Sequence, residues 1–430
     1  MIKYIVTLCL LAVAASAQGI SIEGAYQKAL GYEAELQSNK YQTAAKKDEI
    51  QQAKSRLYPK FDMSASATWG EYELKAAAQN RREEYSTLTL SSSVALYHPE
   101  NFNLLDQAKL KHIYAELGLK ALQQDLAYKV SDAYIAIIRA KNSLSVAKAY
   151  EELNHIKYKQ IAAKYEKRLA NKMDLLQSKV SYQQSVIKVK SEKRNLRLAK
   201  YSFKNLTGIA DVTIADINLE HIDISDLVVP FEKKDLLTKN LEMQKADLSI
   251  AITKKEIQNS RYGWYPKADL SASLSQYDDT SRYRDYTREY TARVTISMPL
   301  FDGGYSSARV AQYKNLLSAA QQDRLKTKRD VETKYDDAVI NLNTSRENIA
   351  LYKETIESAK LYLYATNKAY EHGLTSLIDV EDAKARLFDA KFQLIDSVYN
   401  FMQAYTTLLN LYALFDEQKL HLLDNTLFGR

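Results

Sequence analysis

Apolar or small residues recur along much of the chain at alternating steps of four and three, which is the heptad pattern of a coiled coil. One such row is Ala338, Leu342, Ser345, Ile349, Tyr352, Ile356, Ala359, Leu363, Thr366 and Tyr370. A second row is Val380, Ala383, Leu387, Ala390, Leu394, Ser397, Phe401, Ala404 and Leu408. Gly373 lies between the rows and can reverse the chain because glycine readily adopts positive φ. The pattern predicts a helical hairpin over residues 304–412, with its tip near residues 372–376.

The same design occurs earlier in the chain. Leu169 and Asp174 align with Leu374 and Asp379, at an offset of about 205 residues. A heptad row again precedes this copy. We therefore expect a first hairpin over residues 101–206, with its tip near residues 168–172.

Four segments instead alternate apolar and polar residues, which is typical of a strand with two unlike faces. They lie at about 60–70, 85–97, 267–277 and 290–300, and charged segments separate the members of each pair. Their length of about ten residues suits transmembrane β-strands. Half-buried hairpins of a soluble sheet would show a similar pattern.

Aromatic residues favour the membrane interpretation. Trp69, Trp264 and Tyr265 lie near strand ends, where interfacial aromatics are common. No segment beyond residue 17 is apolar enough for a membrane helix. Four strands cannot enclose a lumen, so the free edges are expected to pair with other copies of the chain.

The first residues predict a secretory signal peptide, residues 1–17. Lys3 supplies the positive charge, residues 5–14 the apolar core, and Ala15-Ser16-Ala17 the cleavage site. The mature chain is expected to begin at Gln18. Cys9 is the single cysteine and lies inside the signal, so disulfides are not expected in the mature protein.

Few turn-forming residues interrupt the chain, with 11 glycines and five prolines among 430 residues. We expect a first repeat at 18–208, a connector at 209–235, a second repeat at 236–415 and a tail at 416–430 to which no role is assigned. The net charge of +7 is modest, and charges of both signs alternate along the helices. Nucleic-acid binding is not expected.

Several short motifs resemble the TolC-type outer membrane efflux family across essentially the whole mature sequence. They are the Tyr-Pro-Lys runs at 58–60 and 265–267, Leu-Phe-Asp-Gly-Gly at 300–304, Leu-Thr-Gly at 206–208 and the duplicated tip motif. The resemblance implies an α+β membrane protein. Long antiparallel coiled-coil hairpins would form a periplasmic tunnel, and four transmembrane strands per chain would complete a 12-stranded barrel in a homotrimer.

The family implies a passive exit duct in the outer membrane of a Gram-negative bacterium. The duct would serve a tripartite efflux pump or type I secretion system. Its partners would be outer-membrane lipid, a periplasmic adaptor (membrane fusion) protein and an inner-membrane transporter of RND, ABC or MFS type. The cargo depends on the transporter.

The resemblance also implies gate residues. Asp379 and Asp382 match the segment of the acidic constriction, and their i, i+3 spacing puts them on one helical face. Threefold symmetry would multiply these residues into acidic rings. Multivalent cations would bind to the rings and block the pore. Repulsion among these carboxylates would raise their pKa values. Tyr370 and Asp174 match residues that latch the gate.

The hairpin tips are implied to dock the adaptor. The docking residues are Gly373, Leu374 and Thr375 at one tip and Arg168, Leu169 and Ala170 at the other. Thr375 stands where the family usually has a gate arginine, for which Arg168 is a candidate substitute. Arg168 itself stands where the family often has glycine, and this departure argues against docking at the first tip in the same way as at the second.

Enzymatic interpretations find no support, because the six histidines include no pair at metal-ligand spacing and no nucleotide-binding motif occurs. No catalytic residue, cofactor or structural metal is expected. The alternative is a secreted trimeric coiled-coil adhesin or stalk with a β anchor. Such an anchor would usually occupy one terminus, whereas here the strands lie inside each repeat.

Overall fold

The computed structural model describes residues 20–73, 80–210, 232–279 and 287–428, together with residues 212, 214, 222, 224 and 227. The predicted signal peptide, Cys9 and Gln18 lie outside these residues, as does most of the predicted connector. No helix within the described residues is both long and apolar enough to cross a membrane.

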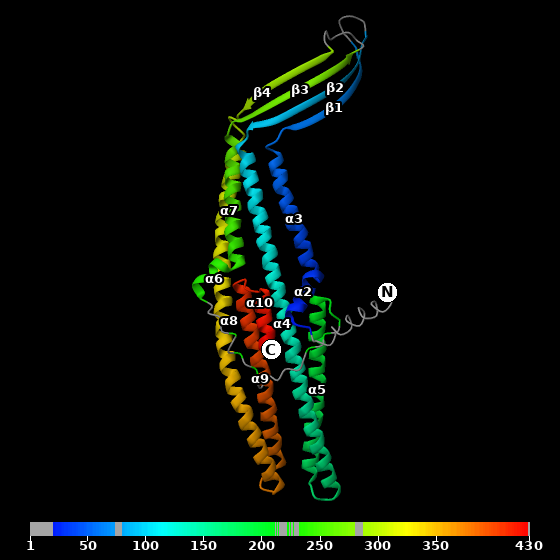
Figure 1. Cartoon of the computed structure of the whole chain (residues 1–430), viewed down its shortest axis with the longest axis vertical. Coiled ribbons are helices and arrows are strands. Elements are labelled where there is room, and N and C mark those ends of the chain that lie inside the picture. The colour runs from blue at the N-terminus through cyan, green and yellow to red at the C-terminus, as the bar shows by residue number, and fades with distance from the viewer. Residues whose placement is uncertain are drawn as a thin grey trace, which may run out of the picture. The chain divides into compact units, whose positions relative to one another are not determined.

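Helices dominate the described chain, and four strands interrupt them (Figure 1). In chain order the elements are α2 (Ile22–Tyr32), α3 (Ala34–Ser55), β1 (Lys60–Glu73), β2 (Asn80–Tyr97), α4 (Pro99–Glu166), α5 (Lys172–Thr207), α6 (Lys233–Lys239), α7 (Leu241–Arg261), the 3-10 turn Tyr262–Trp264, β3 (Lys267–Asp279), β4 (Arg288–Ser297), α8 (Tyr305–Glu371), α9 (Leu377–Leu411) and α10 (Glu417–Phe428). The hairpins α4–α5 and α8–α9 thus reverse between residues 166 and 172 and between residues 371 and 377.

The chain divides into two compact units. Residues 39–118 and 244–327 form one, which we call the sheet unit because it holds all four strands. The remaining described residues form the other, which we call the tip unit because it holds both hairpin turns.

The four strands form one antiparallel sheet in the order β1-β2-β3-β4. The register pairs Met63 with Leu90 and Leu90 in turn with Leu274, so apolar positions of neighbouring strands share one face. The opposite face is hydroxyl-rich: Thr89 hydrogen-bonds to Ser275 at 2.9 Å. Within the described residues, the outer edges of β1 and β4 pair with no other strand.

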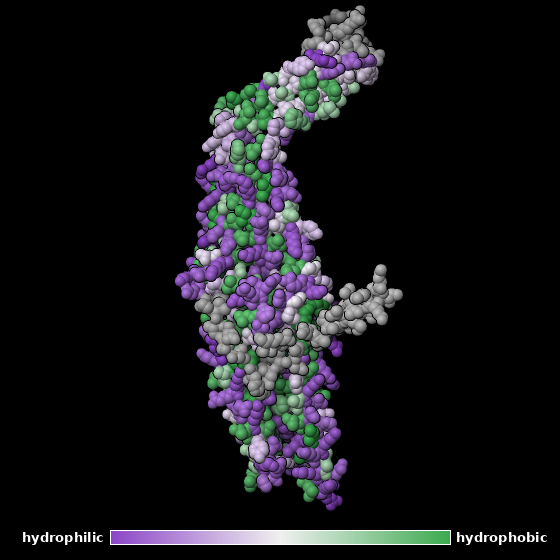
Figure 2. Space-filling model, viewed as in Figure 1, coloured by the Kyte–Doolittle hydropathy of each residue, from purple (hydrophilic) through white to green (hydrophobic). Residues whose placement is uncertain are grey.

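The apolar face of the sheet is open to solvent in a single chain. Met63 is 75% exposed and Ile296 is 73% exposed. Figure 2 shows hydrophobic and pale residues on the strands, whereas hydrophilic residues spread over the helices. Large side chains of this kind are normally buried or covered, so this face requires an apolar environment.

β1, β2 and β3 extend further than the alternating pattern predicted, whereas β4 ends at Ser297, before the predicted end near residue 300. β1 continues to Glu73 and β2 begins at Asn80, so backbone pairing runs into the charged segment that we expected to be a loop. Backbone hydrogen bonds form the ladder irrespective of side-chain polarity. Loss of apolar alternation therefore marked the end of the apolar face and not the end of the strands.

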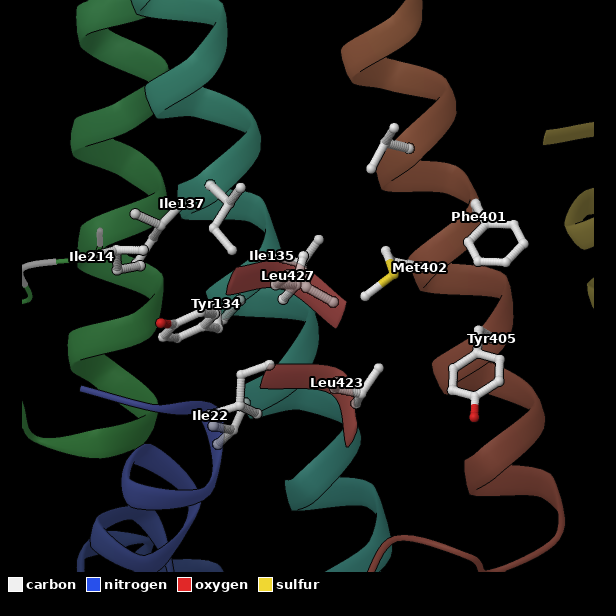
Figure 3. Packing of buried hydrophobic residues seen from close by; sticks show 14 of the residues in the cluster. Ile22, Tyr134, Ile135, Ile137, Ile214, Phe401, Met402, Tyr405, Leu423 and Leu427 are labelled. Atoms are coloured by element: carbon white, nitrogen blue, oxygen red, sulfur yellow. The ribbon is translucent and has the colours of Figure 1, made fainter. Parts of the chain in front are cut away.

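The principal core lies in the tip unit and draws on segments far apart in sequence. Figure 3 shows buried residues from α2, α4, α9 and α10, among them Ile22, Tyr134, Phe401 and Leu423, all of which are fully buried. A smaller cluster, formed by α6, the start of α7, α8 and the end of α9, includes Leu236.

The tail to which the sequence assigned no role is helix α10, and it packs into this core. The carboxylate of Asp424 accepts hydrogen bonds from the amides of Ile22 and Glu23, and the Tyr134 hydroxyl donates to the Ile20 carbonyl at 2.8 Å. These contacts bind the first described residues of the chain to α10 and to α4.

Candidate gate and docking tips

The two hairpin tips share one backbone geometry. At the first tip, the Arg168 amide donates to the Tyr165 carbonyl at 2.9 Å and the Leu169 amide to the Lys164 carbonyl at 2.8 Å. The corresponding bonds at the second tip are Gly373 to Tyr370 at 3.0 Å and Leu374 to Ala369 at 2.9 Å. Both turns close a helix end with a left-handed residue.

That left-handed residue differs between the tips. Gly373 has φ of 72° and Arg168 has φ of 60°. Arginine at the first tip thus adopts the conformation that glycine adopts at the second, at a steric cost of about 1–2 kcal/mol. The two tips therefore have the same backbone conformation, although the first has arginine where the second has glycine.

Each tip presents an apolar side chain at its end. Leu169 is 73% exposed and Leu374 is 80% exposed. Met173 and Ile378, one turn further along α5 and α9, are also exposed. Exposed apolar side chains thus lie at the end of each hairpin, and Leu169 and Leu374 among them belong to the predicted docking residues.

The helix that follows each turn is capped in the same way. The side chain of Asn171 accepts from the Asp174 amide at 2.7 Å, and that of Ser376 accepts from the Asp379 amide at 3.3 Å. Asp379 completes a capping box by accepting from the Ser376 amide at 3.0 Å. Thr375 also donates to Asp379, at 2.5 Å.

These bonds determine the state of the predicted gate carboxylate. Hydrogen bonds from the side chains of Ser376 and Thr375, and then from the Ser376 backbone, lower the pKa of Asp379 to about 2. The direction is opposite to the rise expected from repulsion between like charges. In the single chain Asp379 stays ionised well into acid.

Asp382 lies on the same helix and makes a different contact. Its carboxylate accepts from the Arg386 guanidinium at 2.7 Å across one turn, and both side chains are exposed. The structure therefore places both predicted gate carboxylates at the surface near the second tip. Within the described residues, no group of three His, Cys, Asp or Glu side chains could hold a metal ion.

The predicted latch residue Tyr370 faces a cation from another helix. The Lys157 ammonium lies 4.3 Å from the centre of the Tyr370 ring, and Lys164 lies 6.0 Å away. Burial and then the charge of Asp174 raise the pKa of the Tyr370 hydroxyl. The structure thus brings Tyr370 and Asp174 together and adds Lys157, which the sequence did not single out.

The predicted interfacial aromatics lie at the ends of the sheet. Trp69 is 70% exposed near the end of β1, and Trp264 and Tyr265 are partly exposed just before β3. Tyr265 packs edge-on against Tyr262 at 5.2 Å between ring centres.

A buried polar group on α9 was missed. Glu381 and Lys384 form an ion pair at 2.8 Å, and their side chains are only 8% and 6% exposed. The heptad row that we followed passes beside them, through Val380 and Ala383. A second row, one position further on, would have found them: Leu377, Glu381, Lys384, Phe388, Lys391, Ile395, Val398 and Met402.

Comparison with known proteins gives one consistent relationship. The protein TolC of Salmonella enteritidis is 24% identical over 417 residues, covering 94% of this chain and 84% of the relative. The alkaline protease secretion protein AprF of Pseudomonas aeruginosa is 20% identical, covering 84% and 75%. The CmeC outer membrane channel of Campylobacter jejuni superposes with a TM-score of 0.82 at 15% identity, covering 94% and 89%.

A family model described as outer membrane efflux protein matches residues 25–208 and 234–413. The two matched segments each contain one pair of strands and one helical hairpin. The chain therefore belongs to the outer membrane efflux protein family.

Proposed function

We propose that the chain is the outer-membrane exit duct of a tripartite efflux pump or a type I secretion system. It passively conducts small molecules or proteins that an inner-membrane transporter delivers. The observation that carries this proposal is a sheet with an exposed apolar face and two unpaired outer edges, in a chain that also contributes two long helical hairpins. The family consists of channel proteins, and the chain is not an enzyme.

The sheet is suited to closure by identical copies. With an even number of strands in simple order, β4 runs antiparallel to β1, so β4 of one copy can pair with β1 of the next without breaking the alternation. Three copies then complete a barrel of 12 strands. The apolar face meets lipid, Trp69, Trp264 and Tyr265 lie at its interfaces, and the hydroxyl-rich face lines the lumen.

The helical hairpins form the periplasmic part of the duct. Each repeat, 18–208 and 236–415, contributes one β-hairpin and one helical hairpin. The apolar ends at Leu169 and Leu374 dock a periplasmic adaptor, which connects the duct to a transporter of RND, ABC or MFS type. One relative is named for secretion of a protease and others for multidrug resistance, so both kinds of cargo suit this architecture.

The duct is closed at its tips in the resting state. Asp379 and Asp382 form the constriction and can be blocked by multivalent cations, while Tyr370, with Asp174 and Lys157 beside it, is the latch. Lys157 supplies the cation beside Tyr370, which its position 4.3 Å from the ring centre supports.

Reconstitution in planar bilayers tests the proposal. Protein extracted from outer membranes in detergent should have the mass of a trimer, and it should conduct ions with selectivity for cations. A monomer, or a trimer without conductance under any condition, would contradict a duct. The second result would favour the stalk.

A further inference from the structure

A buried polar cluster joins α9 to α4 in the tip unit. The Lys384 ammonium donates to the Glu381 carboxylate at 2.8 Å and to the Asn154 side-chain oxygen at 2.9 Å. All three residues are more than nine-tenths buried. Asn154 belongs to α4, so this cluster connects one helical hairpin to the other.

The cluster is incompletely satisfied. Within the described chain, the second carboxylate oxygen of Glu381 is buried without a hydrogen-bond partner. The side chain of Asn154 has only the Tyr150 hydroxyl as a further partner. A buried polar group without a partner loses its hydration and gains nothing in return. The closed seam between α4 and α9 therefore holds polar groups that water would satisfy better.

A second lysine lies near the cluster. Lys157 of α4 lies half-buried nearby, and burial and then the charge of Lys384 lower its pKa. The other charged groups acting on Lys157 are Glu381 of α9, Lys164 of α4 and Glu371 of α8. The Lys157 ammonium also lies 4.3 Å from the centre of the Tyr370 ring.

The cluster occupies one place in the seam. From Phe388 toward the core, the same row of α9 continues through the partly buried Lys391 to Ile395, Val398 and Met402, which are buried and apolar. Phe388 packs on Tyr150 of α4 with ring centres 4.6 Å apart. Among the residues of this row that are more than nine-tenths buried, the polar ones thus lie between this aromatic pair and the tip.

We propose that Asn154, Glu381 and Lys384 form a release point, at which α9 separates locally from α4 when the tip opens. Separation rehydrates the three side chains, whereas separation of an apolar seam would expose only hydrophobic surface. The buried apolar residues Ile395, Val398 and Met402 hold the rest of the helix in place. The inference rests on the proposed function, because the opening it serves is that of a duct.

Removal of the polar groups tests the inference. The triple variant Asn154→Leu, Glu381→Leu and Lys384→Met replaces them with apolar groups of similar size, a change that is often neutral or stabilising for buried ion pairs. In hydrogen–deuterium exchange of the trimer, we expect the amides of residues 378–387 to exchange at least about tenfold more slowly than in the wild type. Equal or faster exchange would overturn the proposal.

The matched control is the pair Glu357 and Lys360 of α8, which has the same spacing and the same 2.8 Å contact but is exposed. Glu357→Leu with Lys360→Met should leave exchange at residues 378–387 unchanged. If the triple variant does not assemble, Glu381→Gln with Lys384→Gln keeps a neutral polar pair and should slow exchange by a smaller factor. Faster exchange in this second variant would also refute a release point.

Conductance separates this inference from the proposed function. The triple variant should open several-fold less often than the wild type in planar bilayers; more frequent opening would show that the cluster is a latch and overturn the proposal. If exchange slows as expected in the triple variant but the wild-type trimer does not conduct, the proposed duct function is refuted, whereas the local separation of α9 from α4 is supported.

Discussion

The Asp424 carboxylate accepts the Ile22 amide through both oxygens, at 3.0 and 3.1 Å, although the two residues are 402 positions apart. Asp424 also accepts from the Glu23 amide, so one side chain of α10 caps the first turn of α2. Burial raises the pKa of Asp424 above its ordinary range, and hydrogen bonds from the two amides partly offset this rise. The last helix thereby holds the first turn of α2.

Removal of this cap should destabilise the tip unit. Asp424→Leu leaves the Ile22 and Glu23 amides without their partner, and we expect a loss of about 1–2 kcal/mol in the free energy of unfolding. Denaturant titration in detergent, followed by helical circular dichroism at fixed protein concentration, measures the change. A loss below about 0.3 kcal/mol would show that α10 does not depend on this contact.

The pH dependence of the cap has a defined sign. The folded state binds the Asp424 proton more tightly than the unfolded state, so ionisation of Asp424 reduces stability as pH rises above the ordinary value of about 3.9. Asp424→Asn keeps an acceptor without the charge. The stability of the wild type relative to this variant should fall as pH rises from about 3 through the raised pKa; a constant difference would refute the burial effect.

Arg168→Gly should stabilise the protein. Glycine removes the steric cost of the left-handed conformation but adds flexibility to the unfolded chain, and the net gain should be about 0.5–1 kcal/mol. The matched change Gly373→Ala at the second tip should destabilise by a similar amount. Denaturant midpoints measure both, and opposite signs for the two variants are the expected outcome.

Asp379 should preserve cation selectivity in acid. In the background Asp382→Asn, selectivity carried by Asp379 should persist to about pH 3 and disappear near its pKa of about 2, because the capping bonds favour the ionised form. Reversal potentials across a salt gradient, recorded at a series of pH values, measure this cation selectivity. Loss of selectivity near pH 5 would show that repulsion between copies outweighs the cap.

Replacement of both gate residues, Asp379→Asn with Asp382→Asn, should sharply weaken block by divalent and trivalent cations added on the periplasmic side. Because Asp379 is part of a capping box, this variant should also be less stable than the wild type. Unchanged block in the double variant would remove these residues from the constriction.

The ring of Tyr370, more than its hydroxyl, should hold the latch. Tyr370→Phe keeps the contact with the Lys157 ammonium, so conductance should change little, whereas Tyr370→Leu should raise it. Single-channel recording distinguishes the two. A large increase for the phenylalanine variant would instead assign the latch to the hydroxyl and Asp174.

Docking should involve both tips. Leu374→Asp and Leu169→Asp each place a charge on an exposed apolar end, and each should abolish export while trimer yield remains unchanged, because exposed turn residues contribute little to folding. Drug susceptibility of a strain that depends on this protein, with native gel analysis of the trimer, provides the two readouts. If export is lost only in variants whose trimer yield also falls, these residues are structural and do not dock the adaptor.

The sequence by itself determined the two kinds of hairpin and their turns. The strands appeared as alternation from Phe61 and from Ala268, and the helices as heptad rows on both sides of Gly373, because such periodicities express which side of a single element is apolar. The signal at the second tip was equally local, since Ser376 and Asp379 form a capping box within one turn.

Only the tertiary structure decided which polar residues would be enclosed. Asp424 contacts Ile22 although the two residues lie near opposite ends of the sequence and no local pattern relates them, and the sequence assigned no role to the tail that contains Asp424. From the sequence, Glu381 and Lys384 were expected to be solvated charges. In the structure α9 is covered on two sides, and both residues are buried, with Lys384 hydrogen-bonded to Asn154. Burial of a helix face depends on how many neighbours pack around it, which is a property of the assembled elements and not of any one stretch of sequence.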